Sequence, residues 1–254
     1  MDLHGKAAIV TGSGTGVGRE TVLSLARRGC RVLINYSRSQ EAAEQTAADV
    51  RALDGEAVVK RGDVSSDADC RALVDAAVSA FGRLDVLVNN AGTTSFIDHA
   101  DLEAVGDDDW QRILDVNLKG PFQMSRAAAG PLRQGDGGCI VNVSSIAGLR
   151  AIGSSIPYCA SKAALNNLTV ALARVLAPEV RVNAVAPGFI TGRWLQGGLG
   201  EAYDAVKAGN ERKAPLRRVC DPVDVADAIL SLVTGSELVT AQVLPVEGGI
   251  LVAP

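Results

Sequence analysis

Tyr158 and Lys162 are four positions apart and could exchange a proton with an alcohol or a carbonyl. Side chains at this spacing share a face of a helix, so the lysine ammonium can lie near the phenol. A unit positive charge about 4 Å away contributes ~4 kcal/mol at an effective dielectric near 20, or about three pKa units, as an upper bound. We therefore expect Lys162 to lower the pKa of Tyr158 enough for acid and base chemistry near neutral pH.

The same spacing recurs at Tyr203 and Lys207, so spacing alone does not identify the functional pair. Ser145 lies 13 residues before Tyr158 (145 to 158), and Ile190 holds the equivalent position before Tyr203. A serine hydroxyl can hydrogen-bond a substrate oxygen, whereas isoleucine cannot. We expect the first pair to be catalytic and Tyr203 to pack within a lid.

A glycine-rich turn, TGSGTGVG (11–18), follows an apolar run and precedes a segment of helical period. Glycines there let the backbone approach a pyrophosphate, while the helix N-terminus presents unpaired N–H groups. The alternative is a tight turn without a ligand. The GxGxxG pattern fails because Val17 occupies its last position; the observed spacing is Gly12, Gly16, Gly18.

Strand-like and helix-like segments alternate along the chain, which predicts an α/β fold with a doubly wound, seven-stranded parallel sheet covered by helices on both faces. No repeat or linker divides it, so we expect a single domain over 1–254. The predicted strands are 6–11, 31–35, 57–61, 85–90, 139–145, 181–187 and 242–249, and the predicted helices are 17–28, 39–53, 67–81, 108–133, 157–177 and 221–233. Residues 190–215 break the alternation, and a long excursion of this kind suggests a substrate lid.

The net charge of -4 and the lack of a basic cluster argue against nucleic-acid or membrane partners and favour a small molecule. The N-terminus lacks a signal-peptide pattern, so we expect a cytoplasmic protein. Five scattered cysteines and two histidines show no metal-ligand spacing. We expect the cysteines to be buried apolar residues and no metal to be bound.

The motifs together resemble the short-chain dehydrogenase/reductase family over residues 5 to 250. Besides the glycine turn, they are NNAG (89–92), VNLKG (116–120), VNVSSIAG (141–148), YCASK (158–162) and VNAVAPGF (182–189). The resemblance implies a compact Rossmann-like domain, nicotinamide-dependent oxidoreduction between a carbonyl and a secondary alcohol, and a homotetramer. It also assigns the catalytic roles to Asn117, Ser145, Tyr158 and Lys162. Tyr158 would transfer the proton, Ser145 bond the substrate oxygen, Lys162 bind the nicotinamide ribose, and Asn117 support a water path.

The end of the second predicted strand indicates which dinucleotide is used. NAD-specific sites place an acid there, about 20 residues after the glycines, but this chain has Tyr36 followed by Ser37 and Arg38. The missing carboxylate and the added donors favour NADP, with NAD as the alternative. Thr15 stands where many NADP-preferring relatives carry a basic residue, which weighs against this preference.

The full set of candidate cofactor-binding residues extends along the predicted carboxyl edge of the sheet. It comprises Gly12, Ser13, Gly14, Thr15, Gly16, Val17, Gly18, Tyr36, Ser37, Arg38, Asp63, Val64, Asn90, Ala91, Gly92, Tyr158, Lys162, Pro187, Gly188 and Ile190.

Three functions fit these motifs. The first is an NADP(H)-dependent reductase of a 3-oxoacyl compound or similar small ketone, because the chain most resembles 3-oxoacyl-thioester reductases. The second is an NAD(P)-dependent sugar or polyol dehydrogenase, which differs only in substrate and direction. The third is a non-enzymatic dinucleotide sensor, which would need the glycine turn but not the proton-transfer residues.

Overall fold

Seven parallel strands form one sheet in the order β3-β2-β1-β4-β5-β6-β7 in the computed structural model, which describes residues 1–253. This confirms the predicted doubly wound fold. The order reverses between β1 and β4, and open sheets of this kind bind ligands at such a switch point. The strands are β1 (Ala7–Val10), β2 (Arg31–Tyr36), β3 (Ala57–Arg61), β4 (Val86–Asn89), β5 (Gly138–Val143), β6 (Val180–Pro187) and β7 (Val243–Val246).

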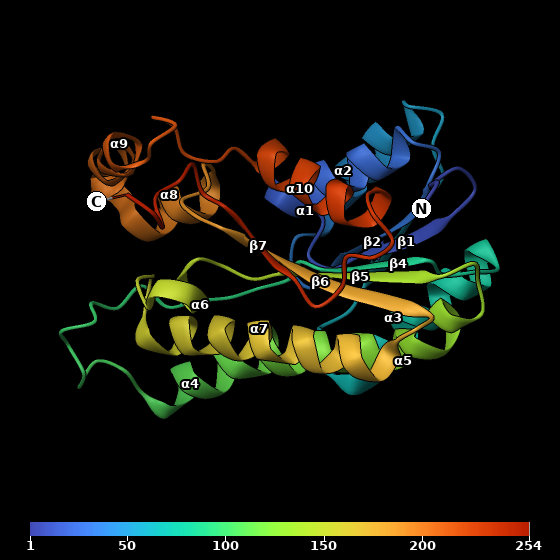
Figure 1. Ribbon diagram of the computed structural model, residues 1–254, viewed down its shortest axis with the longest axis horizontal. Helices are drawn as coiled ribbons and strands as arrows, with labels where there is room; N and C mark the ends of the chain where they lie inside the picture. Colours follow the sequence, from blue (N-terminus) through green and yellow to red (C-terminus); the bar gives the residue numbers. More distant parts are fainter. Residues whose placement is uncertain (254) are drawn as a thin grey trace.

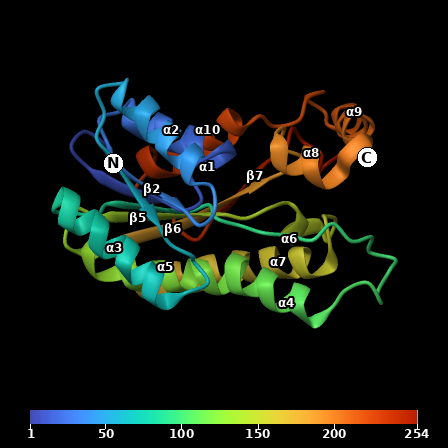
Figure 2. The same cartoon turned by 180° about the vertical axis from the view of Figure 1, so that it is seen from behind.

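Helices cover both faces of the sheet, with α1, α2 and α10 on one face and α3, α5 and α7 on the other (Figures 1 and 2). Strand alternation creates the two cores. Ala8 and Val10 of β1 pack with the first set of helices, and Ala7 and Ile9 pack with the second. The helices are α1 (Gly16–Ala26), α2 (Gln40–Arg51), α3 (Asp67–Phe81), α4 (Asp107–Leu114), α5 (Gly120–Arg133), α6 (Ala147–Arg150), α7 (Ile156–Leu176), α8 (Arg193–Leu199), α9 (Tyr203–Lys213) and α10 (Pro222–Thr234).

Two segments differ from the sequence prediction. The single helix expected over 108–133 is α4 and α5 joined by a π-helical turn, Asp115–Lys119. Residues 190–215 break the predicted alternation of strands and helices, and they contain α8 and α9 joined by a short 3-10 turn, Gly200–Ala202. Gly192 and Gly200 have φ of 134° and 52° and flank α8. Neither α8 nor α9 has a buried residue, so the apolar periodicity that signals a helix is absent.

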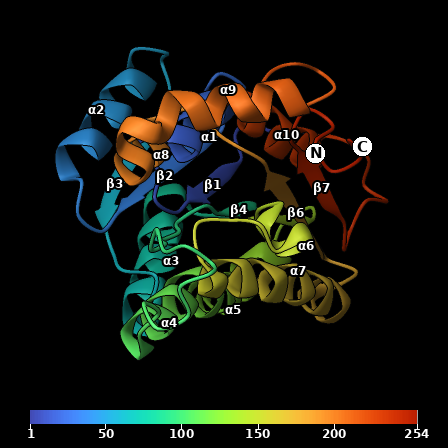
Figure 3. The same ribbon diagram turned by 90° about the vertical axis from the view of Figure 1, so that its left-hand side faces the viewer.

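The segment after β4 leads to α4, β5 is followed by α6 and the start of α7, and β6 is followed by α8. Figure 3 views the molecule from the end that carries α6, α8 and α9. All five cysteines are buried, as predicted. Among residues 1–253, none of the helices combines the length and apolar character needed to cross a bilayer.

Candidate active site

The first turn of α7 positions Tyr158 and Lys162. Ser155 is the N-cap of this helix, and its Oγ accepts a hydrogen bond from the Tyr158 backbone N–H at 3.4 Å. Pro157 lies in the same turn, where its fixed φ suits the start of a helix. One turn later, the Lys162 Nζ lies 5.6 Å from the centroid of the Tyr158 ring. The two side chains therefore share a helix face, as their spacing predicts.

Ser145 follows β5, and its hydroxyl lies beside the Tyr158 phenol. Its Oγ accepts a hydrogen bond from the Ala147 backbone N–H at 3.1 Å and lies 3.5 Å from the Pro187 carbonyl oxygen, to which it donates. Ser144 is buried and points to the other side, toward the body of α7. Alternation at the end of this strand thus brings only Ser145 to the phenol.

Burial of the Tyr–Lys pair shifts both pKa values toward the neutral forms. Burial raises the pKa of Tyr158 to about 12, against the opposing effect of the hydrogen bond with Ser145. Lys162 is 4% exposed, and burial lowers its pKa to about 8. Its Nζ donates to the Val143 carbonyl oxygen at 2.8 Å. Our expectation that Lys162 lowers the pKa of Tyr158 is therefore wrong for this structure, in which desolvation is the largest cause of the shift and the group that opposes it is Ser145.

Asn117 lies fully buried on the π-helical turn and holds the segment that follows β4. Its Oδ1 accepts from the Thr93 backbone N–H at 2.8 Å, and its Nδ2 donates to the Thr93 carbonyl oxygen at 2.9 Å and to Ser161 Oγ at 3.1 Å. A Cβ built on Gly92 would lie 3.8 Å from Lys162 Nζ. The Asn117 side chain thus positions the backbone beside Lys162. π-Helical turns of this kind often mark functional sites.

The glycine turn has the shape of a cradle for an anion. Gly16 has φ of 56°, and a Cβ on this residue would have no atom within 4 Å, so the turn is open there. A Cβ on Gly18 would instead lie 2.6 Å from Asn90 Nδ2, so no larger residue fits. Thr15 is the N-cap of α1, yet its side chain makes no capping hydrogen bond, and no acidic residue lies in the first turn. The first N–H groups of α1 are thus left for a ligand, which fits the pyrophosphate of a dinucleotide.

Several candidate residues support this turn instead of facing its open side. The Asn90 amide donates to the Thr11 and Gly12 carbonyl oxygens at 2.9 and 3.0 Å. Ser13 is buried, and its Oγ donates to the Val10 carbonyl oxygen at 2.7 Å. The remaining residues of the set pack closely: Gly14 against Ala43, Gly12 against Ala91, and Val17 in the core.

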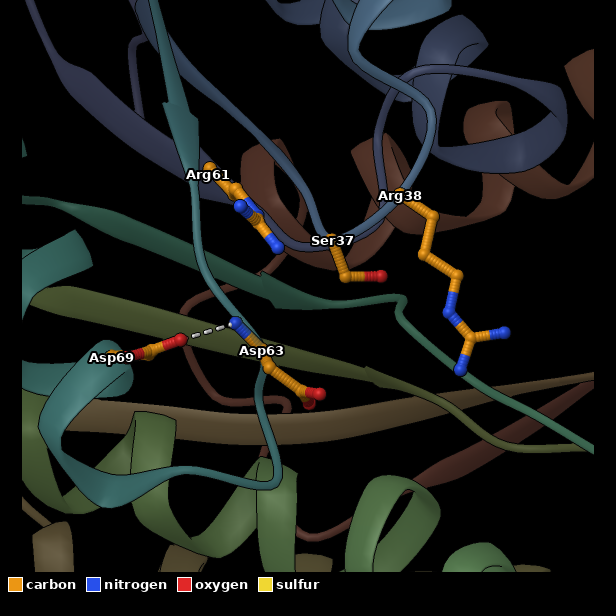
Figure 4. Close-up of a pocket in the computed structure, with 5 residues that line it drawn as sticks. All are labelled: Ser37, Arg38, Arg61, Asp63 and Asp69. Carbon is orange, nitrogen blue, oxygen red and sulfur yellow. Dashed lines mark hydrogen bonds between the residues drawn. The ribbon is translucent and has the colours of Figure 1, made fainter.

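A second group of candidates lies at the ends of β2 and β3. Ser37, Arg38 and Asp63 line a pocket of about 370 Å³ together with Arg61 and Asp69 (Figure 4). Tyr36 pairs directly with Arg61 across the two strands. Arg61 is not among the candidates that the sequence motifs indicate. Pairing the last residues of the two predicted strands would have found it, because both strand ends reach the same edge of the sheet.

The other candidates at this edge hold the backbone. Val64 is buried, and its carbonyl oxygen accepts from a side-chain amide of α5 at 2.9 Å. Pro187 accepts from the Ile146 backbone N–H at 3.0 Å, and Gly188 donates to β7 at 2.9 Å. Ile190 forms an isolated bridge to the segment before α10.

Helix α8, in the segment 190–215, reaches the Tyr–Lys pair. The Trp194 ring on α8 lies edge-on to the Tyr158 ring, with 6.4 Å between centroids. Phe96, in the segment after β4, fills the space where a side chain on Gly198 of α8 would lie. Both aromatic rings are partly exposed, at 52% for Trp194 and 37% for Phe96. Trp194 belongs to the segment 190–215 that the sequence predicts to be a lid, whereas nothing in the sequence pointed to Phe96.

The comparisons agree with this geometry. Residues 6–197 match the family model described as short chain dehydrogenase. The chain is 46% identical over 242 residues to ketoacyl reductase 2 of the granaticin polyketide synthase from Streptomyces violaceoruber, a name that is itself provisional, covering 95% of this chain and 94% of the relative. It is 34% identical to a 3-oxoacyl-[acyl-carrier-protein] reductase from Synechocystis, covering 98% of each.

Solved structures give the same result. An NAD⁺-bound xylitol dehydrogenase matches with a TM-score of 0.90 and 30% identity, covering 98% of this chain and all of the other. A 7α-hydroxysteroid dehydrogenase in complex with NADH and a 7-oxo bile acid conjugate matches with a TM-score of 0.88 and 31% identity, covering 97% and 94%.

The fold and the site define a nicotinamide-dinucleotide oxidoreductase. This chain belongs to the short-chain dehydrogenase/reductase family.

Proposed function

We propose that this protein is an NADP(H)-dependent reductase that converts a ketone, a 3-oxoacyl compound or a similar small carbonyl, into a secondary alcohol. The observation that carries the proposal is the buried Tyr158 phenol beside Ser145 and Lys162. Because burial raises the pKa of Tyr158 to about 12, the phenol holds its proton at neutral pH. A reduction needs this form, since the carbonyl oxygen must gain a proton.

Each side chain of the site then has a role in the proposed reduction. When bound, the nicotinamide supplies the hydride for the carbonyl carbon. The Ser145 hydroxyl donates a hydrogen bond to the carbonyl oxygen and orients it, and Tyr158 gives its phenolic proton to that oxygen as the alcohol forms. Lys162, with a pKa lowered to about 8, can return a proton toward the phenolate and bind the ribose hydroxyls. Asn117 holds the backbone beside Lys162 in place.

The preference for NADP rests on the residues at the end of β2. Tyr36 brings no carboxylate to the adenosine ribose, and Ser37 and Arg38 offer donors to a 2′-phosphate in the same pocket. The polyol dehydrogenase alternative has support from the NAD⁺-bound structural relative. The absence of an acid at position 36 argues against NAD use here, and the complete set of proton-transfer residues argues against a sensor.

A substrate panel tests the proposal. Ketones, β-ketoesters, 3-oxoacyl thioesters and sugars would be assayed in both directions with NADPH and NADH in parallel. We expect ketone reduction with NADPH to have the highest kcat/KM. Attaching the substrate to an acyl carrier protein should raise kcat/KM little. An acidic carrier needs a basic docking surface, but the segments 133–138 and 177–181 mix Arg with Asp136 and Glu179. A panel in which only polyols or sugars react would contradict the proposal.

The choice of dinucleotide can be tested at Tyr36. We expect Tyr36→Asp to shift the preference from NADPH toward NADH, because an acid binds the 2′-hydroxyl and repels a 2′-phosphate. The measurement is the ratio of kcat/KM for the two cofactors in the parent and the variant. Equal use of both cofactors by the unmodified protein would refute the NADP preference.

We also propose a homotetramer, as the family resemblance implies. Light scattering coupled to gel filtration measures the mass directly, and a monomer at micromolar concentration would contradict it.

A further inference from the structure

Two arginines approach one pocket from different strands. Arg38 follows β2, Arg61 ends β3, and Figure 4 shows their side chains on either side of Ser37. Arg61 lies two residues before the candidate Asp63 but is itself part of no family motif named above. Its position follows from the register of the sheet, in which Arg61 is the partner of Tyr36.

Neither guanidinium has a hydrogen-bond or ion-pair partner among residues 1–253, although two acids line the same pocket. The acids already accept hydrogen bonds. Asp63 Oδ1 accepts from the Ser65 N–H and hydroxyl at 2.9 and 2.7 Å, and Asp69 Oδ2 accepts from the Asp63 N–H at 2.8 Å. Each carboxylate is therefore partly occupied, through one oxygen, whereas in the described part of the chain both guanidinium groups keep all five of their N–H donors free.

No other cation of the nearby glycine turn is free to take this role. Arg19 on α1 is paired with Glu20 at 2.6 Å and with Asp49 at 2.8 Å. Thr15, at the N-cap of the same helix, brings no charge. Within the residues that the structure describes, Arg38 and Arg61 are thus the unpaired cations that line this pocket.

We propose that Arg61 is a specificity-determining residue that binds the ribose 2′-phosphate of NADP(H) together with Arg38 and Ser37, one guanidinium on each side of the phosphate. This inference rests on the proposed NADP-dependent function and adds to it a residue on a second strand. A dianionic phosphate matches two planar guanidinium groups and a hydroxyl, whereas the 2′-hydroxyl of NAD(H) gives them nothing to neutralise.

Arg61→Ala tests the proposal, with Lys60→Ala as the matched control. Both substitutions remove one positive charge from the end of β3. Lys60, however, is the neighbouring residue on the strand, so its side chain points to the other face, and it does not line the pocket. A larger loss of NADPH affinity in Arg61→Ala than in Lys60→Ala therefore indicates a direct contact with the phosphate, and not only a weaker positive potential near the pocket.

Dissociation constants for NADPH and NADH would be measured by cofactor fluorescence, and those for adenosine 2′,5′-bisphosphate and adenosine 5′-phosphate by calorimetry. We expect Arg61→Ala to weaken NADPH and the bisphosphate about 10-fold or more, the usual effect of losing a hydrogen bond to a charged group. NADH and adenosine 5′-phosphate should change less than about 2-fold, and Lys60→Ala should change none of the four by more than that. If the alanine variant does not fold, Arg61→Lys keeps the charge without the fork and should still weaken NADPH selectively.

Unchanged NADPH affinity in Arg61→Ala, or an equal loss for NADPH and NADH, would overturn the role of Arg61. That result is distinguishable from failure of the proposed function. If the parent protein prefers NADPH while Arg61→Ala has no effect, only the role of Arg61 fails. If the parent binds NADH as tightly as NADPH, the proposed NADP dependence fails first.

Discussion

The same Tyr-x-x-x-Lys spacing occurs at the start of α7 and at the start of α9, and the two copies lie in opposite environments. On α7, Lys162 is buried and its pKa is lowered to about 8. On α9, the pKa of Lys207 is raised by its hydrogen bond with Glu211. Tyr158 lies beside Ser145 and Trp194, whereas the Tyr203 ring packs on Phe189 with 5.6 Å between centroids.

The difference shows that the surroundings of a motif decide its chemistry. A buried lysine without a carboxylate partner exchanges its proton near physiological pH, while a solvated lysine with an acid four residues away remains an ordinary cation. Helical spacing produces both pairs. Of the two helices, only α7 packs against the sheet, so only its Tyr–Lys pair is buried, whereas α9 has no buried residue.

The largest expected effect comes from the two tyrosines. Tyr158→Phe should keep the fold and cofactor binding and lower turnover by at least ~100-fold, the usual scale for a positioned acid or base. Tyr203→Phe should be mild, because its ring packing is retained. Steady-state kinetics with a cofactor-binding assay would measure both variants. Equal effects, or a larger effect at Tyr203, would mean that the wrong pair has been assigned.

Replacing the two lysines should separate activity from stability. Lys162→Met should lower activity about 10-fold or more and yet raise the melting temperature at pH 7. Burying the charged lysine, whose pKa falls from 10.5 to about 8, lowers the free energy of unfolding by roughly 3 kcal/mol, and methionine removes this cost. The hydrogen bond to the Val143 carbonyl oxygen that the variant loses contributes only about 1 kcal/mol. Lys207→Met should change activity little and should not raise the melting temperature, because Lys207 is paired with Glu211.

The pH dependence of that stability difference follows from linkage. Between about pH 8 and 10.5, the unfolded chain keeps a proton on Lys162 that the folded protein has released, so this group makes stability rise with pH. The advantage of Lys162→Met should therefore be complete below pH 8 and shrink toward pH 10.5. Urea unfolding of parent and variant at pH 7 and pH 10 would show this. A constant difference would mean that the burial of Lys162 has little effect on its charge.

A smaller effect is expected at the lid. Trp194 packs on Tyr158, whereas Arg38 and Arg61 line a separate pocket at the ends of β2 and β3. Trp194→Ala should change the ranking of substrates by kcat/KM several-fold and leave NADPH affinity nearly unchanged. The ketone panel and the fluorescence titration would measure both. A large loss of NADPH affinity with an unchanged ranking would reject α8 as part of the substrate site.

Much of the fold could be predicted because strands and helices leave local patterns. Apolar runs such as 139–145 mark buried strands, and polar or glycine-rich residues at their ends mark the ligand-binding edge. The π-helical turn at Asn117 and the helices α8 and α9 leave no such pattern. The first inserts an extra residue into an apparently continuous helix, and the others have no buried face.

The sequence by itself determined the order of the elements, the shared face of Tyr158 and Lys162, and the missing carboxylate at Tyr36, because each depends on residue type and local spacing. Only the tertiary structure decided the direction of the Tyr158 and Lys162 pKa shifts and the position of Arg61. Desolvation depends on every element packed around a group, and strand register brings together residues 25 positions apart, as it does Tyr36 and Arg61.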